Sequence, residues 1–258
     1  MQFVPFDLEY TQSVWEQQVD INLTESGVHP ISLEHLLDGD DALASRLMQT
    51  ELNYPHVNGI PELRDRIASL YDGASRENVL VTVGAAEANN LIMNTVLEPG
   101  DCLLTQTPTY KQVWGLAVNR GHEVRSFRLQ SEMGWALDVD ELHDKLDEKT
   151  RVIAVVNPNN PTGYILTESE MDTVVSAAGK VGAWILADEV YRGAERERVD
   201  LADETAPDQA DPHSCHQRPP VNQAPDRSWI RRRALAVARC AWRRYGPPRY
   251  AHEGVGRR

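Results

Sequence analysis

The 258-residue sequence predicts an α/β fold in which a mostly parallel sheet is sandwiched by helices. One observation is that, between residues 79 and 188, short apolar runs alternate with longer segments whose apolar residues recur at helical spacing. The other is residues 152–156, five consecutive apolar residues rich in β-branched side chains, which are typical of a strand buried on both faces. Strands and helices that alternate over such a length favour this architecture.

The residues before the alternating region predict an arm and several short helices. An amphipathic segment opens the chain, and two helical stretches follow at Leu33–Leu37 and Asp41–Met48. Pro61 suits the first turn of a further helix, whose apolar side chains recur through Tyr71.

Within the alternating region, strands and helices take turns. The predicted strands are residues 79–83, 102–104, 123–129, 152–156 and 184–187. The predicted helices are residues 85–96, 110–119, 139–146 and 167–181. The last of these helices begins with Thr167 and Glu170, which are spaced as a capping box.

The composition changes sharply near Tyr191. Residues 1–191 contain 12 Lys and Arg against 30 Asp and Glu, a net charge of −18, whereas residues 192–258 contain 14 Arg against 9 Asp and Glu, a net charge of +5. Residues 194–258 include only seven Leu, Ile, Val or Phe, so we expect a non-homologous, disordered tail. Within it, residues 231–245 have the composition of a short basic helix.

The composition also excludes several classes of protein. The three cysteines lack metal-ligand spacing and are too few for an exported disulfide scaffold, which favours a reducing compartment. The sequence contains no basic-then-apolar signal peptide and no run that approaches the roughly 18 apolar residues of a membrane span. We therefore expect a cytoplasmic protein that does not enter a membrane.

Residues with useful chemistry follow the predicted strands, at the edge where open α/β sheets bind their ligands. Gly84, Ala85 and Ala86 open a helix, and free backbone N–H groups there favour a phosphate. Tyr110 follows the next strand and can offer its face to a flat ring. Asn160 stands in a turn stiffened by prolines. Each feature alone also has an ordinary explanation, such as a tight turn or a packing aromatic.

Asp188 ends an apolar strand, three residues before Tyr191. A carboxylate there is costly unless it meets a cation, although a helix cap or a structural ion pair would also account for it. Together, these features provide a phosphate site, an aromatic face, hydrogen-bond donors and a buried carboxylate. This set suits a phosphorylated, aromatic, nitrogen-containing cofactor.

On these residues the chain resembles the pyridoxal 5′-phosphate (PLP)-dependent aminotransferases of fold type I, class I/II, over roughly residues 1–193. Two blocks carry the resemblance, NPNNPTG at 157–163 and ADEVYRG at 187–193. Three further blocks agree with it: NYPHVNGIPELRDRIASLY at 53–71, VTVGAAEANNL at 81–91 and PGDCLLTQTPTY at 99–110. The opening NLTESGVHP at 22–30 resembles a branch that contains capreomycidine-synthase-like enzymes.

The resemblance implies roles at the matching positions. The backbone of Ala85 and Ala86 would hold the cofactor phosphate, and Tyr110 would stack on the pyridine ring. Asn160 and Tyr191 would hydrogen-bond the 3-oxygen of that ring.

The resemblance extends to the ring nitrogen, the substrate and a second subunit. Asp188 would pair with the protonated pyridine nitrogen and keep the ring an electron sink. Tyr54 would reach the phosphate of the neighbouring subunit, which implies a homodimer, and Gly27 would lie against the substrate carboxylate. In this scheme residues 1–45 form an N-terminal arm with part of the small domain, and residues 46–193 form part of the PLP-binding large domain.

One residue that the resemblance requires is missing. Enzymes of this family carry a lysine in a Ser-x-x-Lys block beyond the Asp, which forms a Schiff base with the cofactor and moves the α-proton. This sequence has no lysine after Lys180, which precedes Asp188 and is expected in solvent. Arginine cannot replace it, because a guanidinium stays protonated. We therefore identify no catalytic residue and expect the chain to be inactive.

The sequence thus predicts an aminotransferase by descent, whose substrates are an amino acid and a 2-oxo acid. Another fold type I PLP enzyme (a lyase, a racemase, or a cyclase such as a capreomycidine-synthase-like enzyme) is an alternative, since the same electron sink serves all of them. A second alternative is a non-catalytic protein whose arginines at 231–233, 243 and 244 bind nucleic acid. The acidic body disfavours that interpretation.

We hypothesise that the reading frame shifts just after Gly193, because abundant Arg, Pro and Ala without lysine fit out-of-frame translation of a GC-rich gene. The alternative is a genuine basic tail. Reading the nucleotide sequence in the other two frames tests this hypothesis. We expect a Ser-x-x-Lys block in one of them, and its absence from both would remove the frameshift.

Overall fold

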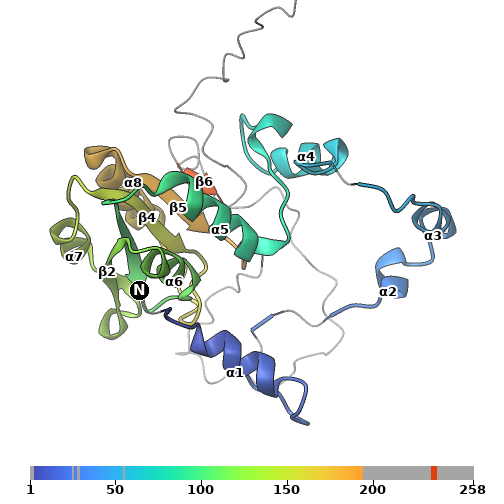
Figure 1. The fold of residues 1–258 in the computed structure, drawn as a ribbon, viewed down its shortest axis with the longest axis horizontal. Helices are drawn as coiled ribbons and strands as arrows, with labels where there is room; N and C mark the ends of the chain where they lie inside the picture. The colour runs from blue at the N-terminus through green and yellow to red at the C-terminus, as the bar shows by residue number, and fades with distance from the viewer. Residues whose placement is uncertain (1–2, 25, 28–29, 55, 194–233, 237–258) are drawn as a thin grey trace, which may run out of the picture.

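The computed structural model describes residues 3–24, 26–27, 30–54, 56–193 and 234–236 (Figure 1). Its strands are β1 Cys102–Thr107, β2 Glu123–Gln130, β3 Ala136–Leu137, β4 Thr150–Val156, β5 Trp184–Asp188 and β6 Ala234–Ala236. In the described residues they form a six-stranded sheet in the order β3-β2-β1-β4-β5-β6. Neighbouring strands are parallel, except that β3 is antiparallel to β2. The predicted mostly parallel α/β fold is confirmed.

The helices lie largely where the sequence predicts them. They are α1 Asp7–Trp15, α2 Leu33–Leu37, α3 Asp41–Met48, α4 Pro61–Ala68, α5 Gly84–Val96, α6 Gln112–Asn119, α7 Val139–Asp144 and α8 Glu168–Val181, with 3₁₀ helices η1 Arg76–Asn78 and η2 Ser131–Met133. Their ends differ from the predicted ends by a few residues, as helix boundaries commonly do. None of the described helices is long and apolar enough to cross a membrane.

The two faces of the sheet bury different side chains, because successive residues of a strand point to opposite faces. Leu104 and Ile153 pack in one core with side chains of α7 and α8, whereas Leu103 and Val152 pack in another with side chains of α5 and α6. All four are fully buried. Helices on both faces explain the continuous apolar run in β4, and they fix the relative positions of β1, β4 and β5.

The predicted strand at residues 79–83 is wrong. Val79 has an extended backbone, with φ −117° and ψ 125°, but no described strand pairs with this segment. Instead, the N–H of Val81 donates to the carbonyl of Asn58 at 3.1 Å, and the carbonyl of Val79 accepts from Nε of Arg64 at 3.0 Å. The β-branched residues favour an extended backbone, whereas a strand also needs a neighbouring strand.

Two strands of the sheet, β3 and β6, were not expected from the sequence. The residues of β6 pair in parallel with residues 185–187 of β5. The expected helix over 231–245 is therefore wrong at these three residues, and the expected disordered tail includes a strand. Local composition favours a helix there, but pairing with β5 is a tertiary effect that overrides local propensity. The rest of residues 194–258 lies outside the described part of the chain.

The N-terminal helices contribute little to the core. Within their described residues, α1, α2 and α3 bury no side chain, and Figure 1 shows α2 and α3 well away from the sheet. Apolar side chains of this region are exposed, for example Leu23 at 90%, Met48 at 86% and Leu52 at 103%. The division into residues 1–45 and 46–193 stays a prediction.

We expect Thr167→Ala to lower the free energy of unfolding by about 1 kcal/mol, because it removes the N-cap of α8. The Thr167 hydroxyl accepts from the N–H of Glu170 at 3.3 Å, and the Glu170 carboxylate accepts from the N–H of Thr167 at 2.7 Å, which confirms the capping box. Urea denaturation measures the change. Thr173→Ala, inside the same helix, is the matched control, and equal losses in the two variants would contradict the capping role.

Candidate cofactor site

Asp188 is a buried carboxylate at the carboxyl end of β5, with an exposed fraction of 5%. Its Oδ2 accepts a hydrogen bond from Nδ2 of Asn89 at 3.0 Å, and its Oδ1 accepts from the backbone N–H of Val190 at 3.2 Å. Its backbone carbonyl accepts from the N–H of Asn157 at 2.9 Å. The carboxylate therefore lies inside the protein, beside the loop that follows β4.

No cation lies beside this carboxylate in the described part of the chain: no Lys, Arg or His nitrogen is within 4.0 Å of its oxygens. Among these residues, Asp188 therefore does not form the structural ion pair that was one of the explanations open from the sequence. A buried carboxylate without a positive partner is costly. Asp188 is therefore suited to a cationic group that the described chain does not supply.

The first turn of α5 offers two free backbone N–H groups. Gly84 has φ +75°, which glycine adopts easily and which turns the chain from an extended path into the helix. No described residue accepts a hydrogen bond from the N–H of Ala85 or Ala86. The carboxylate of Glu87, in the same turn, accepts from the N–H of Val83 and not from Ala85 or Ala86. Free N–H groups at a helix N-terminus favour an anion.

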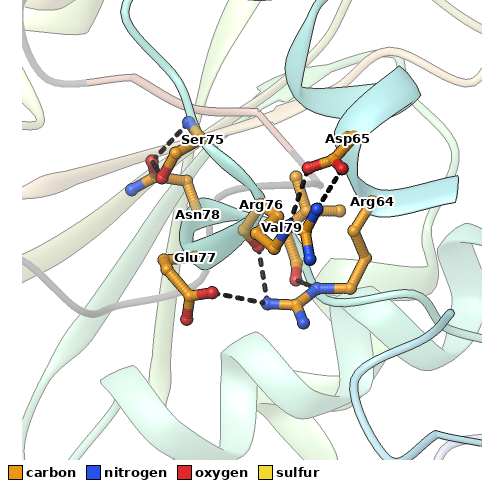
Figure 2. A network of polar contacts seen from close by, with 7 residues as sticks. All are labelled: Arg64, Asp65, Ser75, Arg76, Glu77, Asn78 and Val79. Atoms are coloured by element: carbon orange, nitrogen blue, oxygen red, sulfur yellow. Dashed lines mark hydrogen bonds and ion pairs between the residues drawn. The ribbon is translucent and has the colours of Figure 1, made fainter. Parts of the chain in front are cut away.

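A network of polar contacts fixes the segment that leads into α5 (Figure 2). Arg64 on α4 donates to the carbonyl of Arg76 at 2.6 Å, in addition to its bond to Val79. Arg76 in turn forms an ion pair with Asp65 of α4. Because these contacts join α4 to η1, residues 79–83 keep a defined path into α5 without forming a strand.

Tyr110, which lies between β1 and α6, is held by the N-terminal helix. Its hydroxyl donates to a carboxylate oxygen of Glu9, and its ring packs against that of Phe6 with centroids 4.9 Å apart and an interplanar angle of 59°. Burial raises the pKa of Tyr110 well above its ordinary value, and the hydrogen bond and charge of Glu9, followed by the charge of Asp188, raise it further. The orientation of this ring thus depends on α1.

The side chains of Asn160 and Tyr191 meet each other. Nδ2 of Asn160 donates to the hydroxyl of Tyr191 at 3.3 Å. The same hydroxyl lies 2.7 Å from Oγ of Ser26 in the N-terminal arm. Gly27, expected at the substrate carboxylate, follows Ser26 in the sequence. The structure therefore brings the two expected ligands of the 3-oxygen together, with the N-terminal turn beside them.

The loop that carries Asn160 is tied to the ends of two strands. Gln106, at the end of β1, donates through Nε2 to the carbonyl of Val156 at 3.0 Å and to Oδ1 of Asn159 at 2.7 Å. Asn159 in turn donates to the carbonyl of Pro108 at 3.1 Å. β2 and β3 lie on one side of β1, whereas β4 and β5 lie on its other side, so the strand order reverses between β1 and β4, which is where open α/β sheets bind ligands.

Tyr54 stands apart from these residues. Its side chain is 98% exposed, and its backbone N–H donates to the side chain of Asn53 at 2.7 Å. Its contact with a neighbouring subunit stays a prediction.

Sequence reasoning missed the polar residues that support the site, namely Asn89, Gln112, Gln106 and Ser26. Asn89 is fully buried on α5, beside core residues of the same helix. A polar residue at a core position of a predicted helix is the signal that could have identified it, because buried amides need partners. Two of its partners lie 23 and 99 residues away in the sequence, which no local pattern reveals.

These features fit a phosphorylated aromatic ligand with a cationic nitrogen. The N–H groups of Ala85 and Ala86 at the start of α5 suit a phosphate, and Asp188, which meets no cation among the described residues, suits the nitrogen. Thr109 adds a buried hydroxyl that has no hydrogen-bond partner among the described residues and adjoins Tyr110 in the chain. The described residues include no cluster of His, Cys, Asp and Glu suited to a metal ion.

Comparison with known families gives a match to aminotransferase class I and II over residues 33–213. Nicotianamine aminotransferase 1 of Oryza sativa subsp. japonica is 31% identical over 160 residues, which are 60% of this chain and 32% of that protein. Tyrosine aminotransferase of Homo sapiens is 31% identical over 137 residues, which are 52% of this chain and 30% of that protein. The chain spans about a third of the length of these relatives.

Solved structures give the same result. A PLP-dependent aminotransferase from Streptococcus suis superposes with a TM-score of 0.70 and 32% identity, over 74% of this chain and 52% of that chain. An alanine aminotransferase from Pyrococcus furiosus superposes with a TM-score of 0.61 and 27% identity, over 74% of this chain and 50% of that chain.

We expect Tyr110 to contribute to a loss of stability above about pH 10, the ordinary pKa of tyrosine. Its raised pKa keeps it protonated in the folded chain while the unfolded chain ionises, so the folded state binds more protons and is destabilised as the pH rises. Below that pH the contribution is fully present. Tyr110→Phe should make the loss less steep, as measured by urea midpoints across the alkaline range.

Glu9→Gln provides the matched test, because it removes the negative charge and leaves the ring of Tyr110 in place. The pKa of Tyr110 should fall toward its ordinary value, and the alkaline loss should again become less steep. An alkaline profile unchanged in both variants would contradict this account of Tyr110.

Proposed function

The chain belongs to the aminotransferase class I and II family, and we propose that it retains a PLP site of that family. The reaction that we propose for the family fold is exchange of an amino group between an amino acid and a 2-oxo acid. The observation that carries the proposal is Asp188, 5% exposed and without a basic neighbour among the described residues. A pyridinium N–H would supply the positive charge that this carboxylate does not meet among the described residues, together with a further hydrogen-bond donor.

Each group of residues in the site would bind one part of the cofactor. The N–H groups of Ala85 and Ala86 would hold the phosphate at the N-terminus of α5. Tyr110 would lie against the ring, and Asn160 and Tyr191 would donate to its 3-oxygen. When bound, PLP supplies an electron sink that stabilises negative charge at the α-carbon of an amino acid.

The residue for covalent attachment is not among the 258 residues. All four lysines, Lys111, Lys145, Lys149 and Lys180, are exposed, and no lysine follows Asp188. Under this proposal the chain therefore binds PLP by hydrogen bonds, stacking and charge alone, and it does not exchange amino groups.

The proposed partners are the two small-molecule substrates and a second copy of the chain. The contact between Ser26 and Tyr191 supports a substrate carboxylate near Gly27, because it brings the N-terminal turn to the site. The 98% exposure of Tyr54 and the exposed apolar side chains of the N-terminal arm support a homodimer, which would cover them.

The alternatives have less support. A lyase, cyclase or racemase would use the same cofactor contacts and would differ from an aminotransferase only in how the substrate is held. The arginines proposed to bind nucleic acid lie outside the described residues, and the strongly acidic residues 1–191 would repel a polyanion. Retention on heparin that falls steeply with salt would favour nucleic acid binding.

We expect Asp188→Asn to weaken PLP binding by about thirtyfold, as for loss of a charged hydrogen bond worth about 2 kcal/mol. Equilibrium dialysis of PLP against the purified chain measures the affinity. The same variant should change the thermal stability of the PLP-free chain little, because removal of a buried charge offsets the loss of one of the two hydrogen bonds that Asp188 accepts from Asn89 and Val190. Asp172→Ala, at an exposed position on α8, is the control and should change neither quantity.

Borohydride treatment tests the second half of the proposal. We expect all PLP to leave the reduced protein when it is denatured, because no lysine reaches the site. Covalent retention would contradict this, and its loss in Lys111→Met would assign the lysine nearest to Tyr110 in the sequence. A chain that binds no PLP at all would overturn the cofactor site itself.

A further inference from the structure

We infer that Asn89 and Gln112 are positioning residues that hold Asp188 through a hydrogen-bond relay from the first turn of α5. This inference rests on the proposed PLP site. The relay consists of three hydrogen bonds, from Gln112 to the carbonyl of Ala86, from Asn89 to Gln112, and from Asn89 to Asp188. It joins the residues proposed for the phosphate to the residue proposed for the ring nitrogen.

The relay crosses three elements of the fold. Asn89 lies on α5, Gln112 opens α6 and Asp188 ends β5. Nε2 of Gln112 donates to the carbonyl of Ala86 at 3.0 Å, and Nδ2 of Asn89 donates to Oε1 of Gln112 at 2.9 Å and to Oδ2 of Asp188 at 3.0 Å. Because α5 and α6 pack on the same face of the sheet, the relay is supported by a shared core.

The direction of the relay is fixed by its outer end. The carbonyl of Ala86 can only accept, so Gln112 must present its NH₂ group to Ala86 and its oxygen to Asn89. Asn89 must then present its NH₂ group, whose two hydrogens serve Gln112 and Asp188. The opposite orientation of Asn89 would place its oxygen against two acceptors. Asp188 is therefore held as an acceptor, as a donor on a pyridine nitrogen requires.

The relay leaves one acceptor of Asn89 unpaired. Asn89 is fully buried, and its Oδ1 has no hydrogen-bond partner among the described residues. An unpaired buried acceptor costs stability, so a residue chosen for stability alone would not be an asparagine here. Both hydrogens of its NH₂ group are used and its oxygen is not. The hydrogen bond that Asn89 donates to Asp188 therefore explains why an asparagine occupies this buried position.

The relay fixes the orientation of the Asp188 carboxylate before any ligand binds. Oδ1 of Asp188 is held by the N–H of Val190 and Oδ2 by Asn89, so both oxygens have fixed positions. Loss of Asn89 or Gln112 should therefore weaken recognition of the ring nitrogen while the phosphate contacts of Ala85 and Ala86 remain.

The test compares PLP with 1-deaza-pyridoxal 5′-phosphate, in which a C–H replaces the ring nitrogen, on the full 258-residue chain. Binding of both compounds is measured by equilibrium dialysis for the wild-type chain, Asn89→Leu, Gln112→Leu and Asn94→Leu. Asn94 is the matched control, because it is an exposed asparagine on α5 whose side chain bonds to Asn90 and Arg120. Thermal unfolding checks that each variant is folded.

We expect the wild-type chain and Asn94→Leu to bind PLP more tightly than the deaza compound. In Asn89→Leu and Gln112→Leu this preference should fall by about tenfold, as for loss of a hydrogen bond to a charged group. Affinity for the deaza compound should change little. A merely structural role would weaken binding of both compounds equally and leave the preference intact. Gln112 is only partly buried, so its variant keeps the test open if Asn89→Leu does not fold.

The outcomes separate the relay from the cofactor site. A wild-type chain that binds the two compounds equally would overturn the pairing of Asp188 with the ring nitrogen, and the relay with it. A wild-type preference that persists in both folded relay variants would overturn the relay alone.

Discussion

The site depends on one costly arrangement, the burial of the Asp188 carboxylate without a cation among the described residues. Two N–H donors, from Asn89 and Val190, meet its oxygens, but neither neutralises its charge. Hydrogen bonds can orient a buried carboxylate, whereas full compensation of its lost hydration needs an opposite charge. The fold therefore holds a fixed negative charge at the end of β5, and the neighbouring polar residues are arranged with respect to it.

That arrangement is possible because the sheet fixes the ends of its strands. Side chains on both faces of β1, β4 and β5 pack against helices, so the loops that follow these strands start from defined positions. Gln106 and Asn159 then join the loops after β1 and β4, and the N–H of Asn157 joins β4 to Asp188. The N-terminal arm completes the set through Glu9 and Ser26, which contact tyrosines far along the chain. The parallel strands therefore fix where the site residues lie, and the long-range polar contacts fix how their side chains are oriented.

How much the sequence revealed depended on the range of each interaction. The capping box of α8 and the buried strand β4 depend on neighbouring residues and were predicted correctly. Residues 79–83 carry the composition of a strand, but whether an extended segment joins a sheet depends on distant residues, and here Asn58 and Arg64 take its hydrogen bonds. Asp188 and Asn160 could be expected at the same edge of the sheet, because each stands at or just after the carboxyl end of a predicted strand and the two strands are parallel. The relay through Asn89 could not be predicted from the sequence, because the packing of α5, α6 and β5 determines which side chains Asn89 contacts.

In the proposed cofactor site, the residues that bind the ligand by hydrogen bonds and charge are separate from the lysine that would attach it covalently. The described residues include candidates for the first role. A buried charge and an unpaired acceptor at Asn89 both lower the stability of the free chain. A ligand that neutralises the charge returns part of that stability, and by linkage it shifts the folding equilibrium in proportion to its affinity. Selection for stability alone would therefore favour replacement of Asp188 and Asn89 by apolar residues of similar size. Their presence together, at the same edge as the first-turn N–H groups of α5, fits the proposed site for a cationic, phosphorylated ring.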